Sequence, residues 1–303
     1  MPTWRTRNSR TSDAPLGEAD LPDRRRGATS SGVNVEMLLA DLPMQHASVS
    51  RALLVLDDPN ASAQDIAAVL QSDPALCARA LQLANSAHFG MSGRVTSVDQ
   101  AVVALGATAM RTLVVSTAAG MFGRPDDLPA GFWEHSVAVA AATAIAARMY
   151  SVPRGDAICA GLLHDLGAAL LFRYDRPAYQ TFIDTGAVAA DKMLEDETRM
   201  YGADHATIGA AALRAWKLPT SIVDALRTHH LNPGDVGERL GRVVIAGEAL
   251  ARAAFEPGPF SHEPRQDPGV VFDTLGVRVA SVDTLVTRTA EEAEILAQML
   301  APV

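Results

Sequence analysis

A histidine and an aspartate stand next to each other in an otherwise apolar stretch of this sequence, Ala160 to Phe172, which reads AGLLHDLGAALLF. The stretch predicts an apolar helix that contains both His164 and Asp165. Leaving even a polar group buried without a partner costs roughly 2–7 kcal/mol. The pair must therefore lie on the solvent-exposed side of the helix, or a buried group or ion must interact with both side chains.

Other histidines are spaced so that they could meet this pair. The sequence has eight histidines, and five of them lie in or at the ends of predicted helices: His135, His164, His205, His229 and His230. Imidazoles with a carboxylate, spread over several helices of a bundle, are typical of a metal site. Neighbouring residues of a helix point about 100° apart, so an ion shared by His164 and Asp165 must lie beside the helix. Ligands from the helices on either side would complete its shell.

A metal-free interpretation stays open beside this one. A single histidine in an apolar helix is more often a core residue with satisfied hydrogen bonds than a ligand, and His46, His88 and His262 are interpreted in that way. For the clustered histidines, a structural or vestigial pocket and a pocket that holds an ion are both compatible with the sequence.

The composition limits the class of protein. With 303 residues, 48% of them hydrophobic, the chain can build extensive cores, and its length suggests about two domains of ~150 residues each. The formal net charge of −9 argues against a broad nucleic-acid surface. Cys77 and Cys159 lie in apolar helical patterns and are expected to be reduced, which favours a cytoplasmic location.

The first 33 residues differ from the rest of the chain. They are rich in Arg, Ser, Thr, Pro and Gly, and they have almost no apolar periodicity. We expect residues 1–33 to be a disordered tail that is dispensable for folding. They contain no apolar run long enough for a signal peptide, and no later segment lacks charges for the ~20 residues of a membrane span.

From Val35 onward the pattern predicts one helix after another. The expected N-caps are Ser62, Asp73 before Pro74, Ser97, Asp156 ahead of the His-Asp stretch, and Asp204. Gly106 is expected to end the helix that starts after Ser97, and residues 123–131 form the clearest interior boundary. No convincing alternation with a period of two occurs, so the predicted fold class is all-α.

The predicted helices include blocks that follow one another in a characteristic order. The first reads SDPALCARALQLANSAHFGMSGRVTSVDQAVVALGATAMRTLVVSTAA, and FWEHSVAVA, AGLLHDLGAALL, YGADHATIGAAALRAWKLPTSIVDALRTHH and the last helical segment follow it. Over roughly residues 35–300, this series resembles the HDOD branch of the HD superfamily of metal-dependent phosphohydrolases. The resemblance implies a two-lobed helical bundle, with an N-terminal lobe over residues 34–124 and an HD-like lobe over residues 125–303.

The resemblance also implies a set of metal ligands. His135 matches the first ligand of the superfamily, and His164 and Asp165 match the pair that gives it its name. Glu248, in the segment GEALA, matches the final ligand, which is usually an aspartate.

Three further histidines match a related branch. His205, His229 and His230 fall where the HD-GYP phosphodiesterases hold additional metal ions. Imidazole ligands favour a divalent transition metal such as Fe, Mn or Zn over Ca²⁺.

The catalytic accessories of the HD-GYP enzymes are missing. Ala168 stands where those enzymes have a lysine, and HHLNPGD replaces their glutamate and Gly-Tyr-Pro signature. Loss of one such stabilising group typically costs about 10²–10³ in rate. Arg173, Arg214 and Arg227 are alternative cations near the motifs, although each also fits a surface role.

Three classes of function follow. The first is a signal-transduction protein that binds a signalling partner or a nucleotide second messenger and keeps a catalytically weak metal pocket. The second is an active metal-dependent phosphohydrolase or cyclic-dinucleotide phosphodiesterase. The third is DNA binding through a helix-turn-helix at VDQAVVALGATAMRTLVV, but this segment offers only Thr108, Arg111 and Thr112 for contacts and is better explained by core packing. We expect neither a nucleic-acid partner nor a membrane.

Overall fold

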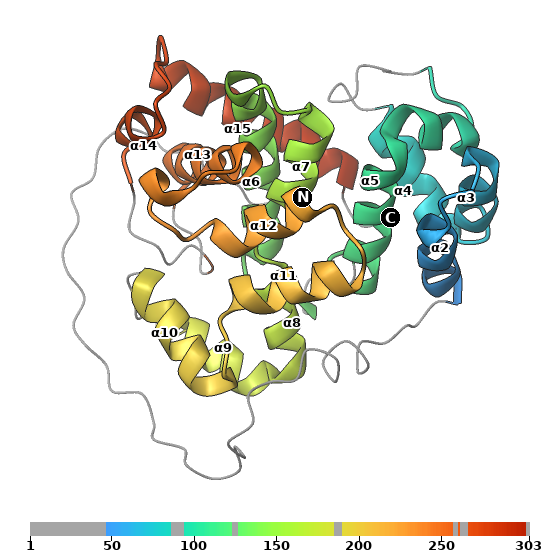
Figure 1. Cartoon of the computed structure of the whole chain (residues 1–303), viewed down its shortest axis with the longest axis horizontal. Coiled ribbons are helices and arrows are strands. Elements are labelled where there is room, and N and C mark those ends of the chain that lie inside the picture. Colours follow the sequence, from blue (N-terminus) through green and yellow to red (C-terminus); the bar gives the residue numbers. More distant parts are fainter. Residues whose placement is uncertain are drawn as a thin grey trace.

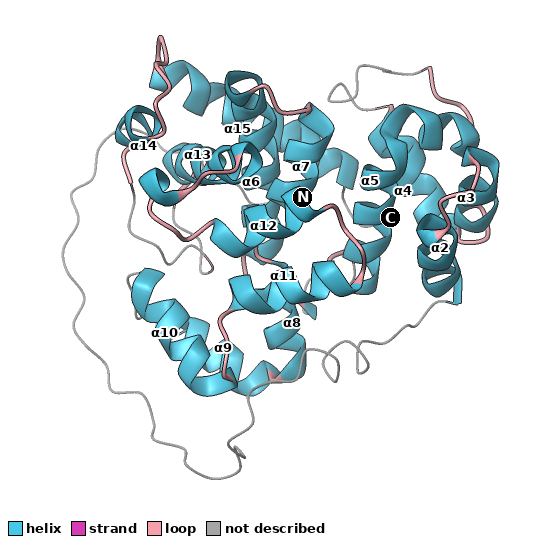
Figure 2. Cartoon of the chain, viewed as in Figure 1, coloured by secondary structure: helices cyan, strands magenta, loops and turns pink. Residues whose placement is uncertain are grey.

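The computed structural model of the chain describes residues 47–85, 94–122, 127–184, 190–256, 260 and 266–300. All regular elements in these ranges are helical, which confirms the predicted all-α class (Figure 1 and Figure 2). The helices are α2 (Ala47–Asp57), α3 (Ala63–Leu70), α4 (Pro74–Ala84), α5 (Val98–Ala118), α6 (Phe132–Ala146), η3 (Ala147–Tyr150), α7 (Arg154–Leu163), α8 (Leu166–Tyr174), α9 (Arg176–Asp184), α10 (Ala190–Tyr201), α11 (His205–Ala215), α12 (Thr220–Thr228), η4 (Pro233–Asp235), α13 (Arg239–Ala254), α14 (Pro268–Thr274) and α15 (Val282–Leu300). The predicted tail and His46, His88 and His262 lie outside the described residues.

Side-chain caps confirm four of the predicted helix starts. At α3, the Ser62 hydroxyl accepts the Asp65 N–H and the Asp65 carboxylate accepts the Ser62 N–H, which completes a capping box. Ser97, Asp73 and Asp204 each accept the N–H of the residue three positions later, at the starts of α5, α4 and α11. Local sequence was sufficient here because a cap and its partner lie within one turn.

The His164-Asp165 stretch departs from the prediction in two ways. The helix α7 begins after Pro153, so Asp156 lies in its first turn and is not its N-cap. The pair also does not lie within one helix, because α7 ends before His164, and Asp165, at φ −100° and ψ 17°, precedes α8. Apolar residues continue on both sides of this break, so the hydrophobic pattern could not reveal it.

The buried apolar side chains form one continuous core, which extends from Val49 to Ala297. Helices α2 to α5 lie together at one end of the molecule (Figure 1), and they join the rest through α5 against α7 and α4 against α15. Two apolar helical stretches, Val98–Ala118 and Arg154–Tyr174, are long enough to cross a membrane, but 67% and 89% of their apolar windows are buried inside the structure. Both stretches therefore belong to the core of this fold.

The segment that resembles a helix-turn-helix belongs to the same core. Gly106, at φ 76° and ψ 170°, interrupts α5 as expected. Beyond it, Thr108 is half-buried and both Arg111 and Thr112 are buried. The Arg111 guanidinium donates to Asp57 Oδ1 at 2.7 Å. This helix therefore directs Arg111 and Thr112 inward, where they cannot read a duplex.

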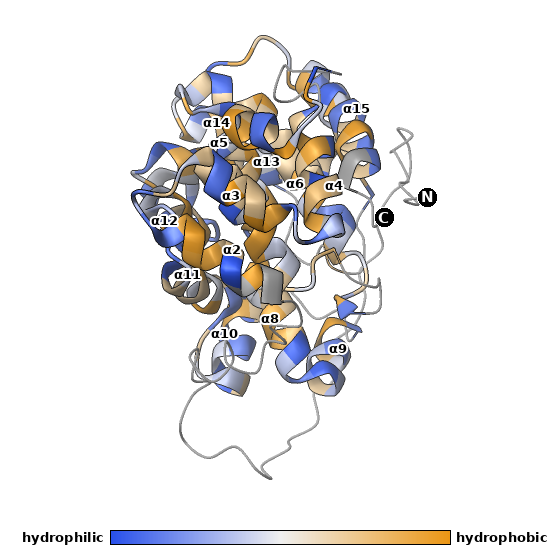
Figure 3. Cartoon of the chain, turned by 90° about the vertical axis from the view of Figure 1, so that its right-hand side faces the viewer, coloured by the Kyte–Doolittle hydropathy of each residue, from blue (hydrophilic) through white to orange (hydrophobic). Residues whose placement is uncertain are grey.

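Glycines let the helices that carry candidate ligands approach one another closely. A Cβ atom on Gly161 of α7 would lie 2.5 Å from Thr143 Oγ1 of α6, and one on Gly247 of α13 would lie 2.6 Å from Thr143 Cγ2. Thr143 thus contacts a glycine of each neighbouring helix. The α6 helix between them is apolar along most of its length, whereas α10 at the lower end is far more polar (Figure 3).

Replacing Gly167 with alanine is expected to disrupt an even closer contact. The helices α8 and α11 cross at Gly167 and Gly209, and a Cβ atom on Gly167 would lie 1.9 Å from the His205 backbone oxygen. Because a backbone atom cannot swing aside, α11 would have to move, at a cost of about 1–3 kcal/mol in the free energy of unfolding. Chemical denaturation measures this loss. Gly237→Ala is the matched control, since nothing lies within 4 Å of a Cβ atom there. Equal losses in both variants would contradict the importance of the crossing.

Candidate metal centre

All seven candidate ligands converge, and they do so in two groups that share Asp165. In the first group, His164 Nε2 lies 2.8 Å from Asp165 Oδ2 and 2.7 Å from Glu248 Oε1. His135 Nε2 lies 3.2 Å from Glu248 Oε1 and 3.4 Å from Asp165 Oδ2. We call these four residues half-site A.

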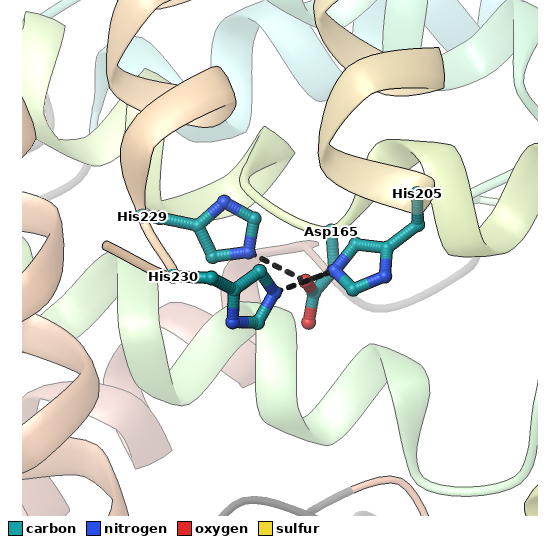
Figure 4. A group of neighbouring side chains, drawn as sticks. All are labelled: Asp165, His205, His229 and His230. Carbon is teal, nitrogen blue, oxygen red and sulfur yellow. Dashed lines mark hydrogen bonds and ion pairs between the residues drawn. The ribbon is translucent and has the colours of Figure 1, made fainter. Parts of the chain in front are cut away.

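The second group uses the other oxygen of Asp165 (Figure 4). Asp165 Oδ1 lies 3.3 Å from both His205 Nε2 and His229 Nε2, and His205 Nε2 lies 2.7 Å from His230 Nε2. We call Asp165, His205, His229 and His230 half-site B. Within each half-site, each residue offers one ligand atom, and these four atoms all lie within 4.8 Å of one another. This spacing could enclose an ion.

The ends of helices bring these side chains together. His164 and Asp165 occupy the break between α7 and α8, and His205 is the first residue of α11. The α12 helix ends at Thr228, so the next two histidines leave the helix with their rings 3.8 Å apart. His135 and Glu248 are contributed by α6 and α13, which pack against each other.

Hydrogen bonds at the far side of the rings orient three of the imidazoles. His164 and His229 each hold Nδ1 against the carbonyl oxygen three residues earlier, at 2.8 and 2.5 Å. Because a carbonyl only accepts, Nδ1 must donate and Nε2 keeps its lone pair in the neutral ring. His205 places Nδ1 2.7 Å from the Glu197 carboxylate in the same manner. All three Nε2 atoms face Asp165, which is the arrangement that metal-binding histidines require.

The buried charges also fit a cation. Asp165, Glu248 and Glu197 are 6%, 7% and 0% exposed, and Arg252 Nε lies 2.7 Å from Glu248 Oε2. Burial opposes the charge of His164, yet Asp165 and Glu248 raise its pKa to about 10. A protonated His164 therefore supplies positive charge beside these carboxylates. A bound divalent ion would supply that charge in place of the proton. Imidazole nitrogens with carboxylate oxygens suit Fe, Mn or Zn, so the donor set fits the expected class of metal.

His229 stands out among the histidines of the cluster. Burial lowers its pKa to about 4, and the neighbouring His230 adds to this effect. A neutral imidazole is the form that binds a metal. His229 is therefore in its ligand form at neutral pH.

Three residues of the centre, Glu197, Tyr179 and Arg252, were not predicted from the sequence. Glu197 on α10 accepts hydrogen bonds from His205 and from the Tyr179 hydroxyl, and Arg252 pairs with Glu248. The i,i+4 spacing of Glu248 and Arg252 was a usable signal for the pair. Nothing in the local pattern distinguished Glu197 from the other acidic residues of its segment.

The alternative cations lie elsewhere. Arg173 donates to the Ala119 carbonyl at 3.4 Å, Arg214 is exposed, and Arg227 is 58% exposed and faces Asp224. None of the three has a described contact with the centre. They are therefore not substitutes for the missing lysine in this structure.

Comparisons with known proteins show the family to which this fold belongs. A family model for the HDOD domain matches residues 42–232. An uncharacterised protein of Treponema pallidum is 27% identical over 216 residues, which are 68% of this chain and 40% of that protein. The chain thus spans less than half the length of this relative.

Solved structures share the fold. A Shewanella amazonensis protein with the provisional name phosphohydrolase is 24% identical, with a TM-score of 0.62 over 88% of this chain and 98% of that one. A Marinobacter aquaeolei protein, provisionally named for signal transduction, is 24% identical, with a TM-score of 0.63 over 91% of this chain and 63% of that one. At this identity the similarity establishes the helical fold alone. Together with the matched family model, these observations show that the chain belongs to the HDOD family.

Proposed function

We propose that this protein is a cytoplasmic regulatory HDOD protein that works by binding a signalling partner or a nucleotide second messenger. The observation that carries the proposal is Ala168, which is fully buried in α8 where the related phosphodiesterases have a lysine. Phosphoryl transfer depends on positive charge around the attacking and leaving oxygens. Arg252, the arginine that pairs with Glu248, has its Nε committed to that carboxylate.

The centre retains the residues needed to hold a metal. Half-site A and half-site B would each take a divalent transition metal such as Fe, Mn or Zn, with Asp165 offering one oxygen to each half-site. A bound ion of this kind supplies Lewis-acid chemistry and an acidified water. We infer that occupancy here supports the structure and ligand binding more than turnover.

Metal analysis combined with a hydrolysis assay tests this proposal. Protein purified without chelator is expected to contain Fe, Mn or Zn at stoichiometric level, measured by elemental analysis. The same preparation should show no hydrolysis of a cyclic dinucleotide or a generic phosphodiester above the rate of a metal-depleted sample. A preparation that contains only Ca²⁺ or Mg²⁺ would contradict the proposed class of metal.

An active phosphohydrolase is the second candidate, because every ligand type of the centre is retained. Under that alternative, hydrolysis with Mn²⁺ or Fe²⁺ would be robust. It would also disappear in an Asp165→Ala variant that remains folded. Both results together, with a nucleotide or with a phosphodiester, would replace the regulatory proposal with the enzymatic one.

A further inference from the structure

Glu197 is a buried carboxylate whose hydrogen bonds lead directly to the metal centre. Its side chain is 0% exposed, and so is that of Tyr179. The Tyr179 hydroxyl donates to Glu197 Oε1 at 2.6 Å. Glu197 Oε2 lies 2.8 Å from the His205 backbone nitrogen and 2.7 Å from His205 Nδ1. Both oxygens of this carboxylate are therefore engaged.

These contacts hold His205 at two points. The backbone contact holds the first residue of α11, and the ring contact sets the rotation of the imidazole. The ring then directs Nε2 toward Asp165 and His230, which are its neighbours in half-site B. A carboxylate on Nδ1 also makes Nε2 a stronger donor to a metal.

Glu197 reaches the centre from a helix that is otherwise polar. The α10 helix lies at the edge of the molecule, beside α9 (Figure 1). Its buried side chains include Met193 and Tyr201 besides Glu197, and the Tyr201 ring lies 6.1 Å from that of Tyr179. A buried carboxylate is costly unless its charge is matched. The burial of Glu197, and with it the inward packing of α10, therefore depends on the positive charge that His205 presents to this carboxylate.

We propose that Glu197, held by Tyr179, is a positioning residue of half-site B that couples metal occupancy to the packing of α10. The inference rests on the proposed metal binding and adds a residue and a helix to it. An ion bound at half-site B would strengthen the contact of His205 Nδ1 with Glu197, and this contact holds α10 in place. By thermodynamic linkage, weakening the contact must weaken the binding of the ion.

The test uses the full chain and measures binding of Zn²⁺ and Mn²⁺ by competition with a chelator. Glu197→Gln keeps the size of the side chain and removes its charge, so affinity should fall about 10- to 100-fold. Tyr179→Phe leaves the carboxylate in place and should cause a smaller loss. Asp196→Asn is the matched control, because Asp196 is a buried carboxylate of the same helix that pairs with Arg199 instead of the centre. This control should bind metal as the wild type does.

Hydrogen exchange supplies a second readout that does not depend on activity. Metal should slow exchange over residues 190–201 in the wild type and in Asp196→Asn, and this effect should be lost in Glu197→Gln. A wild-type protein that binds no ion would refute the proposed metal function itself. If the wild type binds metal and Glu197→Gln binds it equally well, the positioning role is wrong. If Glu197→Gln fails to fold, unchanged affinity in Tyr179→Phe would overturn the inference.

Discussion

Replacing Asp165 with alanine should abolish the stabilisation of this protein by transition metals. Asp165 is the residue common to both half-sites, with Oδ2 at 2.8 Å from His164 Nε2 and Oδ1 at 3.3 Å from His205 Nε2. For the wild type, an ion at about 100 times its Kd adds about 2.7 kcal/mol to the free energy of unfolding. This corresponds to a rise in Tm of roughly 5 °C or more. The variant should show no rise with Zn²⁺ or Mn²⁺ in a thermal scan.

Asp156→Ala provides the control for this experiment. Asp156 is a half-buried aspartate in the first turn of α7, the helix that ends before His164. Its loss should leave the metal-dependent rise in Tm unchanged. An Asp165→Ala variant that retains half or more of the wild-type rise would show that the two half-sites do not depend on a shared carboxylate.

Replacing Arg111 with methionine should lower the free energy of unfolding by about 1.5–3 kcal/mol, the range for a hydrogen bond to a charged group. The Arg111 side chain is 10% exposed and lies 2.7 Å from Asp57 Oδ1. It also donates to the Leu56 carbonyl and, at 3.0 Å, to the Trp216 carbonyl at the end of α11. Methionine keeps an apolar stem but leaves all three acceptors without this donor. Urea denaturation measures the loss.

Arg227→Met is the surface control for Arg111. Arg227 is 58% exposed and lies 3.7 Å from Asp224. Exposed pairs of this kind contribute less than about 1 kcal/mol. Losses of similar size at Arg111 and Arg227 would contradict the role of Arg111 as a buried link between α2, α5 and α11.

The contribution of Arg111 should also depend on pH. Burial opposes the charge of Asp57, but hydrogen bonds from Lys217 and Arg111 outweigh it and hold the pKa of Asp57 below its ordinary value of 3.8. A carboxyl group with a lowered pKa in the folded state stabilises the fold above its unfolded pKa, and this stability is lost as the pH falls through the folded pKa. The difference between the wild type and Arg111→Met should therefore narrow in acid.

Short-range signals in the sequence were sufficient for the helical class and for four of the five predicted N-caps. Ser62, Asp73, Ser97 and Asp204 cap their helices as predicted, because each cap is decided within a few residues. Asp156 failed as a predicted cap because α7 begins at Arg154, directly after Pro153, which places Asp156 within the first turn.

The candidate ligands were found through the order of the motifs, and the structure brings all of them together. The sequence did not reveal the residues that hold these ligands in place. The chain has 35 acidic residues, and nothing near Glu197 shows that its side chain turns toward His205. That contact joins α10 to α11. The contact of Arg252 with Glu248 becomes part of the centre only because Glu248 faces the histidines in the fold.

The sequence by itself therefore determined the helical class, four of the five predicted caps and the types of residue available for a metal. Only the tertiary structure decided which residues support these ligands and how one carboxylate faces both half-sites. The helix break at Asp165 and the crossing of Gly167 with Gly209 bring α8 and α11 close enough for one carboxylate to face both half-sites. The physical reason is that hydrogen bonds within a helix act over a few residues, whereas the approach of two helices depends on small residues far apart in the chain.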